Sequence, residues 1–182
     1  MSRVFIGGSR RITRLNPEVT LRLDRMIAQQ VSIVVGDAAG ADKSIQQYLN
    51  TKGFRDVEVF SSGDECRNNV GNWPLRRVTV ESRKRDFDFY AAKDQVMARE
   101  ADSGLMIWDG KSAGTLMNAL RLVRQGKQVS IFEAQHARFR DLQSDSEWKD
   151  FFSGCSDEVR RRIETLSASD STVALPVQAS LL

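Results

Sequence analysis

The feature that most constrains the fold of this chain is an alternation, over residues 1–133, of short apolar runs with segments of helical periodicity. The apolar runs are too short for helices and are apolar throughout, as strands buried on both faces are. The predicted strands are Val4–Ile6, Val31–Val35, Val57–Phe60, Leu105–Trp108 and Gln128–Phe132. This alternation predicts an α/β fold in which helices cover both faces of a five-stranded parallel sheet.

Capping residues predict where several of the helices begin and end. Asn16 followed by Pro17 is typical of a helix N-terminus. The Asn side chain accepts a hydrogen bond from a free backbone N–H of the first turn, and Pro has no backbone N–H that would need a partner. Gly53 and Gly126 favour the left-handed conformation that ends a helix. The helices predicted after the first one cover 40–51, 86–101 and the stretch from Leu116 to Gly126.

Two regions depart from the alternation. Residues 61–85 form a long connection with six basic residues and Trp73, and long connections in compact domains are usually functional or disordered. After the fifth strand the pattern becomes that of polar helices, over 134–152 and 157–166. We therefore expect a Rossmann-like domain over 1–133, a helical appendage over 134–166 and a disordered tail over 167–182.

Composition excludes several classes of protein and of site. The sequence has no apolar run of about 18 residues, which a membrane span needs, and its start does not resemble a secretory signal, so we expect a cytoplasmic protein. Cys66 and Cys155 are far apart and His136 is the only histidine, so the sequence predicts no disulfide framework, metal site or Ser-His-Asp triad. We also expect no bound cofactor. Any chemistry must rely on carboxylates, amides, hydroxyls and basic groups.

The predicted topology places two glycine-containing loops together. Right-handed crossovers give a doubly wound sheet the strand order 3-2-1-4-5, with the ligand crevice beyond the carboxyl ends of strands 1 and 4. Glycines let the backbone approach an anion, and a helix N-terminus favours negative charge. We expect phosphate to bind Gly7, Gly8, Ser9 and Arg10 after the first strand, and Gly110, Lys111, Ser112, Gly114 and Thr115 after the fourth. The alternative is that both loops are plain turns with a helix cap.

The second strand ends in the sequence GDAAGAD, residues 36–42. Its spacing matches neither a dinucleotide fingerprint nor a Walker loop. We expect Gly36, Asp37, Gly40 and Asp42 of this loop to bind the ligand, with the carboxylates of Asp37 and Asp42 as candidates for binding ribose hydroxyls. Alternatively, Asp37 bonds to its own turn and Asp42 stabilises the first turn of a helix.

Three sequence blocks resemble those of a known superfamily. GGSR at 7–10, GDAAGAD at 36–42, and KDQVMAREAD at 93–102 followed by WDGKSAGT at 108–115 are similar to the YspA-type branch of the SLOG superfamily. That Rossmann-like group includes DprA and the LOG phosphoribohydrolases, and the resemblance covers residues 3–132. It implies a five-stranded sheet that binds a nucleotide or nucleotide derivative, as a hydrolase of the N-glycosidic bond in some branches and as a sensor in others.

The residues that the LOG enzymes use for catalysis are replaced in this chain. Where their Arg-Lys-x-x-Met motif begins with arginine, this sequence has Lys93, and where their Pro-Gly-Gly-x-Gly-Thr-x-x-Glu motif ends with glutamate, it has Asn118. A neutral amide does not stabilise an oxocarbenium-like transition state as a carboxylate does. Asp94 and Asp109 are the candidates to supply the carboxylate, with Lys93 beside them, and whether the protein is an enzyme stays open.

Three functions are compatible with these features. The leading hypothesis is that a nucleotide or nucleoside-phosphate derivative binds at the switch point, with possible hydrolysis of an N-glycosidic bond. The second is a non-catalytic nucleotide sensor that acts through a partner or an oligomer. The third is binding of single-stranded nucleic acid through the basic connection and Trp73, as DprA relatives bind single strands. We also expect a homo-oligomer, and Trp148, Phe151 and Phe152 would pack either on their own domain or on a second chain.

Overall fold

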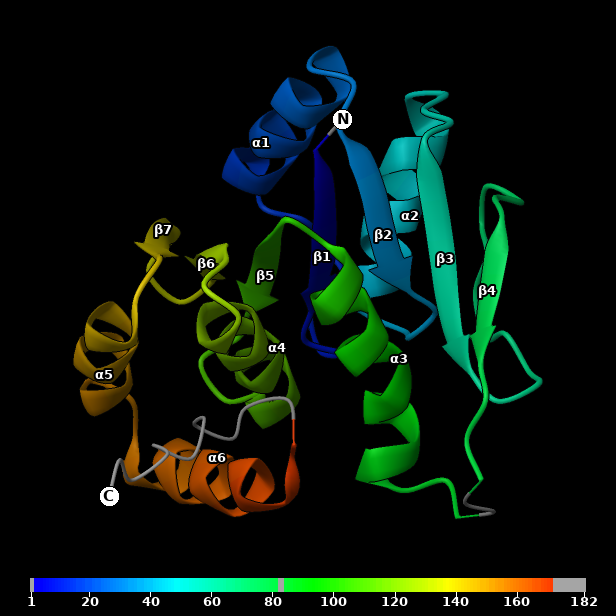
Figure 1. Cartoon of the computed structure of the whole chain (residues 1–182). Helices are drawn as coiled ribbons and strands as arrows, with labels where there is room; N and C mark the ends of the chain where they lie inside the picture. Colours follow the sequence, from blue (N-terminus) through cyan, green and yellow to red (C-terminus); the bar gives the residue numbers. More distant parts are fainter. Residues whose placement is uncertain (1, 82–83, 172–182) are drawn as a thin grey trace, which may run out of the picture.

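A computed structural model of the protein describes residues 2–81 and 84–171 and consists of one seven-stranded sheet with helices on both faces (Figure 1). The strands are β1 (Arg3–Gly8), β2 (Ser32–Gly36), β3 (Val57–Ser62), β4 (Leu75–Val78), β5 (Ser103–Trp108), β6 (Gln128–Glu133) and β7 (Arg138–Leu142). The helices are α1 (Pro17–Ala28), α2 (Ala41–Thr51), α3 (Phe87–Glu100), α4 (Ala113–Arg124), α5 (Asp145–Ser153) and α6 (Asp157–Ser169). None of the helices described is both long and apolar enough to cross a membrane.

The predicted order of the inner strands is confirmed. The sheet order is β4-β3-β2-β1-β5-β6-β7, and its five central strands are the predicted ones in the predicted order. These five strands are parallel, and β1 pairs with both β2 and β5. The switch point therefore lies between β1 and β5, as the topology rule requires.

The predicted strand count of five is too low, because a strand flanks the central set on each side. β4 lies inside the connection that we expected to be a loop, and it adds to β3 in parallel through pairs such as Phe60 with Arg76. β7 pairs antiparallel with β6 and replaces much of the helix predicted over 134–152. Both strands are short, partly exposed and rich in arginine, so neither has the apolar signature of a buried strand.

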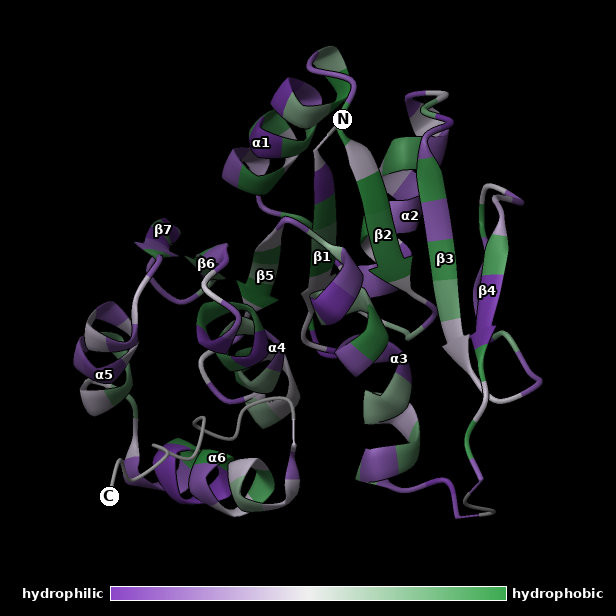
Figure 2. Cartoon of the chain, viewed as in Figure 1, coloured by the Kyte–Doolittle hydropathy of each residue, from purple (hydrophilic) through white to green (hydrophobic). Residues whose placement is uncertain are grey.

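Alternate residues of the central strands form separate apolar cores on the two faces of the sheet. Val4 and Ile6 of β1 pack with residues of α1 and α2, while Phe5 packs on the opposite face with residues of α3 and α4. Figure 2 shows the central strands as the most hydrophobic part of the chain. This arrangement is the doubly wound fold that burial of strands on both faces predicts.

The predicted helix boundaries follow from local hydrogen bonds and backbone conformation. The Asn16 side chain accepts a hydrogen bond from the amide of Glu18 at 2.9 Å, and Pro17 is the first residue of α1. Gly53 after α2 and Gly126 after α4 have φ angles of +65° and +69°. Both glycines therefore end their helices in the left-handed conformation, as predicted.

The C-terminal helices complete the core on the α4 side of the sheet. Trp148 and Phe151 of α5 and Ile163 of α6 are buried in the same apolar cluster as α3 and α4. The aromatic residues of α5 thus pack on their own chain, so they do not support the expected homo-oligomer. The predicted tail begins too early, because α6 extends to Ser169 and Asp170 is buried, while residues 172–182 lie outside the described part of the chain.

Candidate functional site

A crevice with a cavity volume of about 650 Å³ opens beyond the carboxyl ends of β1 and β5. It brings together most of the predicted site residues: Gly7, Gly8, Ser9, Arg10, Asp42, Lys93, Asp94, Asp109, Lys111, Ser112, Gly114, Thr115 and Asn118. Four predicted residues, Gly36, Asp37, Gly40 and Gly110, do not line it. We refer to the charged lining residues at its mouth as the rim and to the polar lining residues at its base as the floor. The rim consists of Arg10, Arg11, Arg85, Asp86, Asp109, Lys111, Glu158 and Arg162, and the floor consists of Asp42, Lys93, Asp94 and Asn118.

Gly8 allows the loop after β1 to pack closely against the sheet. A Cβ atom at Gly8 would lie 2.5 Å from the carbonyl oxygen of Ile107, which is too short for a real contact. The next residue, Ser9, donates its amide to that same carbonyl at 3.0 Å, and its hydroxyl accepts the amide of Arg11 at 3.2 Å. Packing of β1 against β5 therefore accounts for glycine at this position, and it sets the path of the backbone along the crevice.

Gly40 has a similar structural role in the loop between β2 and α2. Its φ angle is +78°, and a Cβ atom there would lie 2.2 Å from the carbonyl oxygen of Arg10. Residues with a Cβ atom strongly disfavour that backbone conformation, and their Cβ atom would also collide with the backbone of Arg10. The GDAAGAD loop is thus packed directly on the segment that carries Arg10 into the crevice.

The N-terminus of α4 faces the crevice through Ser112, Ala113, Gly114 and Thr115. Ser112 is the N-cap residue, yet its side chain caps no amide of the helix. Asp109 organises the turn before it, because its Oδ1 accepts the amides of Lys111 at 3.0 Å and Ser112 at 2.7 Å. Partial burial raises the pKa of Asp109, but these hydrogen bonds outweigh the effect and hold the pKa below its usual value. Asp109 is therefore charged.

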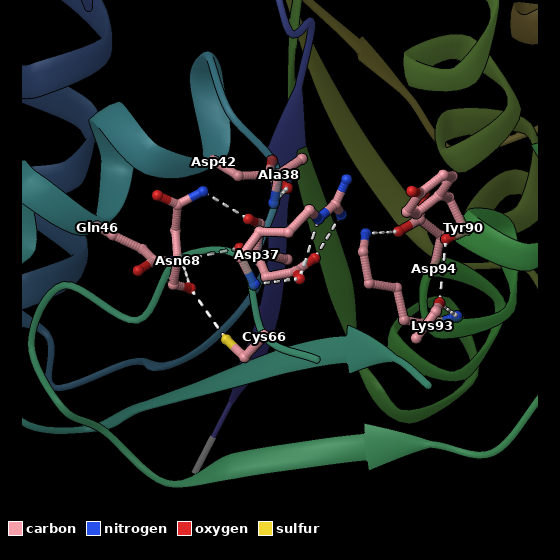
Figure 3. A network of polar contacts seen from close by, with 12 residues as sticks. Asp37, Ala38, Asp42, Gln46, Cys66, Asn68, Tyr90, Lys93 and Asp94 are labelled. Atoms are coloured by element: carbon pink, nitrogen blue, oxygen red, sulfur yellow. Dashed lines mark hydrogen bonds and ion pairs between the residues drawn. The ribbon is translucent and has the colours of Figure 1, made fainter. Parts of the chain in front are cut away.

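The floor contains an ion pair contributed by α3, in which Lys93 is buried and Asp94 is partly buried. The Nζ atom of Lys93 lies 2.5 Å from Oδ1 of Asp94 (Figure 3). Nδ2 of Asn118 donates to Oδ2 of the same carboxylate at 3.1 Å. Burial lowers the pKa of Lys93, but the carboxylates of Asp94 and Asp42 outweigh it and raise the pKa above its usual value. Lys93 is thus charged, and both oxygens of Asp94 already accept hydrogen bonds.

Asp37 is held by an arginine that the sequence analysis did not connect with it. The Nε and Nη2 atoms of Arg67 lie 3.1 and 2.5 Å from the two Asp37 oxygens, and the Arg67 amide donates at 3.0 Å. Burial raises the pKa of Asp37, but the hydrogen bonds from Arg67 prevail and keep the pKa below its usual range. The carboxylate that we expected to bind ribose therefore already has partners for both oxygens.

Asp42 differs from the other buried carboxylates because it has no ion-pair partner within 4.0 Å among the described residues. Its Oδ2 accepts a long hydrogen bond, 3.4 Å, from the Ala38 amide. Burial is the main cause that raises its pKa to about 6, and the nearby Lys93 ammonium limits the rise. Asp42 is thus the carboxyl of the crevice that changes its charge near neutral pH.

Several lining residues come from parts of the chain in which no site was predicted. Phe87 and Tyr90 of α3 line the crevice, as do Glu158 and Arg162 of α6. The guanidinium of Arg10 lies over the Tyr90 ring at 5.1 Å from its centroid. No local pattern marks these residues, because the packing of α3 and α6 beside α4 is what brings them to the crevice.

The predicted nucleic-acid surface does not have the expected composition. Trp73 is only 6% exposed and donates its indole N–H to the carbonyl of Phe54 at 3.0 Å, so its ring is not available for stacking. Trp108 is likewise buried, and its indole N–H donates a hydrogen bond to the carbonyl of Ser112. Arg76 is held by Glu58 and Glu100. Within residues 2–81 and 84–171, no cluster of three His, Cys, Asp or Glu side chains is arranged to hold a metal ion.

Comparisons with known proteins show similarity at the level of the fold. No protein-family model matches the sequence, and comparison with curated proteins finds no match. Among solved structures, the chain is similar to DNA processing protein A from Helicobacter pylori, which was described for its unique mode of binding single-stranded DNA. The TM-score is 0.54 with 18% sequence identity, over 91% of this chain and 80% of that chain. The two proteins therefore share a Rossmann-like fold.

Proposed function

We propose that this protein binds single-stranded nucleic acid in the crevice between β1 and β5. The observation that carries the proposal is the composition of the rim, where five exposed cations stand beside an uncapped helix N-terminus and aromatic rings. The cations are Arg10, Arg11, Arg85, Lys111 and Arg162. Proteins that bind single strands combine such a basic groove with aromatic or guanidinium planes on which bases stack.

Glu65 pairs with Arg85 at 3.0 Å, and the acidic residues of the rim do not cancel the other four cations. Asp109 is engaged with the backbone amides before α4, and Asp86 accepts the amide of Phe89 at the start of α3. Glu158 is the remaining acidic residue of the rim. We assign the strand's phosphates to the loop after β1 and to the start of α4, and its bases to the guanidinium plane of Arg10, which lies over the Tyr90 ring.

The fold shared with a single-stranded DNA-binding protein supports this assignment. It also favours, as part of the same proposal, a place for this chain in the SLOG superfamily, whose sequence blocks it resembles. The predicted phosphate-binding residues then form the contact surface, namely Gly7, Gly8, Ser9, Arg10, Lys111, Ser112, Gly114 and Thr115. Gly36, Gly40 and Gly110 would shape the loops and make no contact with the ligand.

The test is the salt dependence of binding to a fluorescent oligo(dT), measured by anisotropy for the wild type, Arg10→Gln, Lys111→Gln and Arg55→Gln. Arg55 is exposed and precedes β3, at the opposite end of the sheet, so it is the matched control. Each crevice variant is expected to weaken binding and to reduce the slope of log K against log salt by roughly 0.7, the value for one phosphate of a single strand. Salt-independent binding, or an equal loss in Arg55→Gln, would contradict the proposal.

A free nucleotide is the second candidate ligand. An extended strand could bind along the rim alone, whereas the polar residues of the floor would contact a small ligand that enters the crevice. Lys93, Asp94, Asn118 and Asp42 form a small convergent polar set, as in concave sites for small ligands. Thermal stabilisation by AMP, ADP, NAD, ADP-ribose or cyclic nucleotides would support it, at about 2.7 kcal/mol for a ligand at 100 times its Kd. Stabilisation by a nucleotide without any binding of oligo(dT) would favour this candidate over the first.

Release of free base in the same samples would identify a hydrolase, whereas stabilisation without product would identify a sensor. Both oxygens of Asp94 are held by Lys93 and Asn118, and Asp109 is charged, so these two carboxylates are placed to stabilise a cationic transition state. The assignment of these two carboxylates to catalysis, with Lys93 holding Asp94 in place, fails if Asp94→Asn and Asp109→Asn both leave base release intact.

A further inference from the structure

The balance of charge in the crevice changes with depth. At the rim, the five exposed cations outnumber the acidic residues. Below the rim, the Lys93 ammonium is already paired with Asp94. Asp42 is the carboxyl left over, so the floor is suited to a neutral group that donates hydrogen bonds and is poorly suited to a phosphate.

The position of Asp42 leaves one of its oxygens facing the cavity. Its Oδ2 lies against the loop, where it accepts the Ala38 amide and would be 2.5 Å from a Cβ atom at Gly36. No group in the described part of the chain donates a hydrogen bond to Oδ1, although the residue is only 6% exposed and lines the crevice. Oδ1 is not one of the fully buried side-chain oxygens that lack a partner, so it is accessible from the cavity and can accept a hydrogen bond from a ligand group there.

Gly36 is necessary for this arrangement. A Cβ atom there would also lie 2.8 Å from Nζ of Lys93, so the glycine makes room for a carboxylate and an ammonium at one point of the floor. The charged groups around Asp42 are Asp37 from the β2–α2 loop, Lys93 and Asp94 from α3, and Arg67 from the connection after β3 (Figure 3). Each of these four groups has an ion-pair partner, whereas Asp42 has none within 4.0 Å among the described residues.

On the premise that the crevice binds a nucleotide unit, we propose that Asp42 is its specificity-determining residue. Oδ1 of Asp42 accepts a hydrogen bond from a donor on the sugar or on the base, while the phosphate stays at the rim. A 2′-hydroxyl and an exocyclic amino group both supply such a donor. The shared chemistry is a neutral N–H or O–H group placed one nucleoside away from a phosphate, and this combination of groups matches the division of charge between rim and floor.

The experiment compares pairs of 12-nucleotide strands that differ in one donor. Oligo(rU) and oligo(dU) differ in the 2′-hydroxyl. Oligo(dA) and a strand in which every adenine is replaced by unsubstituted purine differ in the 6-amino group. Affinities are measured for the wild type, Asp42→Asn and Asp88→Asn. Asp88 is an exposed residue of α3 that does not line the crevice, so its variant removes the same charge without touching the floor.

We expect the wild type to prefer the donor-bearing strand of one pair by roughly tenfold or more, the scale of a hydrogen bond to a charged group. Asp42→Asn should abolish that preference and Asp88→Asn should keep it. A preference within the first pair identifies the sugar as the source of the donor, and one within the second pair identifies the base. Absence of any preference in the wild type, or its survival in Asp42→Asn, overturns the inference.

A pH titration of the wild type gives an independent measurement that needs no variant to fold. Protonation of Asp42 removes its charge and turns one of its oxygens into a donor, so the hydrogen bond to the ligand weakens and the preference should fall as the pH drops below about 6. A preference that is constant from pH 8 to pH 5 would contradict a role for this carboxylate. If no strand binds at all, the proposed function fails as well, whereas binding without any preference removes only the inference about Asp42.

Discussion

The backbone at Gly40 illustrates how one residue sets the geometry of the crevice. Gly40→Ala combines a φ angle of +78° with a collision against the carbonyl of Arg10. Gly126 has a φ angle of +69° with no atom within 4 Å of its Cβ position, so Gly126→Ala carries the conformational cost alone. We expect a loss of about 1 kcal/mol for Gly126→Ala and of roughly 2 kcal/mol or more for Gly40→Ala. Urea denaturation measures both, and equal losses would show that the Arg10 contact is unimportant.

The buried carboxyl of Asp42 predicts an unusual pH dependence of stability. Its pKa is raised from 3.8 to about 6, so between these values the native state binds a proton that the unfolded state does not. The free energy of unfolding should therefore rise as the pH falls from 7 to 5, by about 1 kcal/mol relative to Asp42→Asn. Asp37 and Asp109 have lowered pKa values and act in the opposite direction, mainly at lower pH. Identical pH profiles for the wild type and Asp42→Asn would contradict this prediction.

At the scale of elements, a buried ion pair joins α4 to the end of α6. Arg121 is 1% exposed and donates from Nε and Nη2 to Oδ2 of Asp170, at 2.9 and 2.5 Å. Its Nη1 donates to Oδ1 of Asn118, which turns the Asn118 amide N–H toward Asp94. The C-terminal end of α6 is therefore connected to the floor of the crevice through three side chains.

A double-mutant cycle tests that connection. Arg121→Met and Asp170→Leu alone each remove one partner of a buried pair and should destabilise the protein by about 3 kcal/mol or more. The double variant should lose less than the sum, because it leaves no uncompensated charge at that contact. Additive losses in urea denaturation would show that the pair is not coupled.

At the scale of the whole molecule, the shared core indicates that residues 134–166 unfold together with residues 1–133. Ile163 of α6 belongs to the apolar cluster on the α4 face, whereas Ile45 of α2 belongs to the cluster on the other face. We expect Ile163→Ala and Ile45→Ala each to lower the midpoint of a single calorimetric transition, at a cost of about 2–5 kcal/mol. A separate transition that responds only to Ile163→Ala would show instead that the C-terminal helices form an independent unit.

The sequence by itself determined the features that depend on neighbouring residues and on general rules of topology. Asn16, Gly53 and Gly126 mark helix boundaries because capping involves residues within one turn. The apolar character of the central strands predicts burial on both faces, and the handedness of crossovers then brings the loops after β1 and β5 together. These local and topological constraints were sufficient to predict the order of the five central strands and the two loops that meet at the crevice, whereas Lys93, Asp94 and Asn118 were predicted from the family resemblance.

Only the tertiary structure decided the features that depend on contacts between distant parts of the chain. Arg67 binds Asp37 from a different loop, and Arg162 reaches the crevice from α6. β4 and β7 are strands because a neighbouring strand satisfies their backbone, although their own residues lack an apolar pattern. The environment of a buried carboxyl likewise depends on which hydrogen-bond donors and cations the tertiary structure places beside it. For this reason three similar aspartates, Asp37, Asp42 and Asp94, have different environments that no local pattern distinguishes.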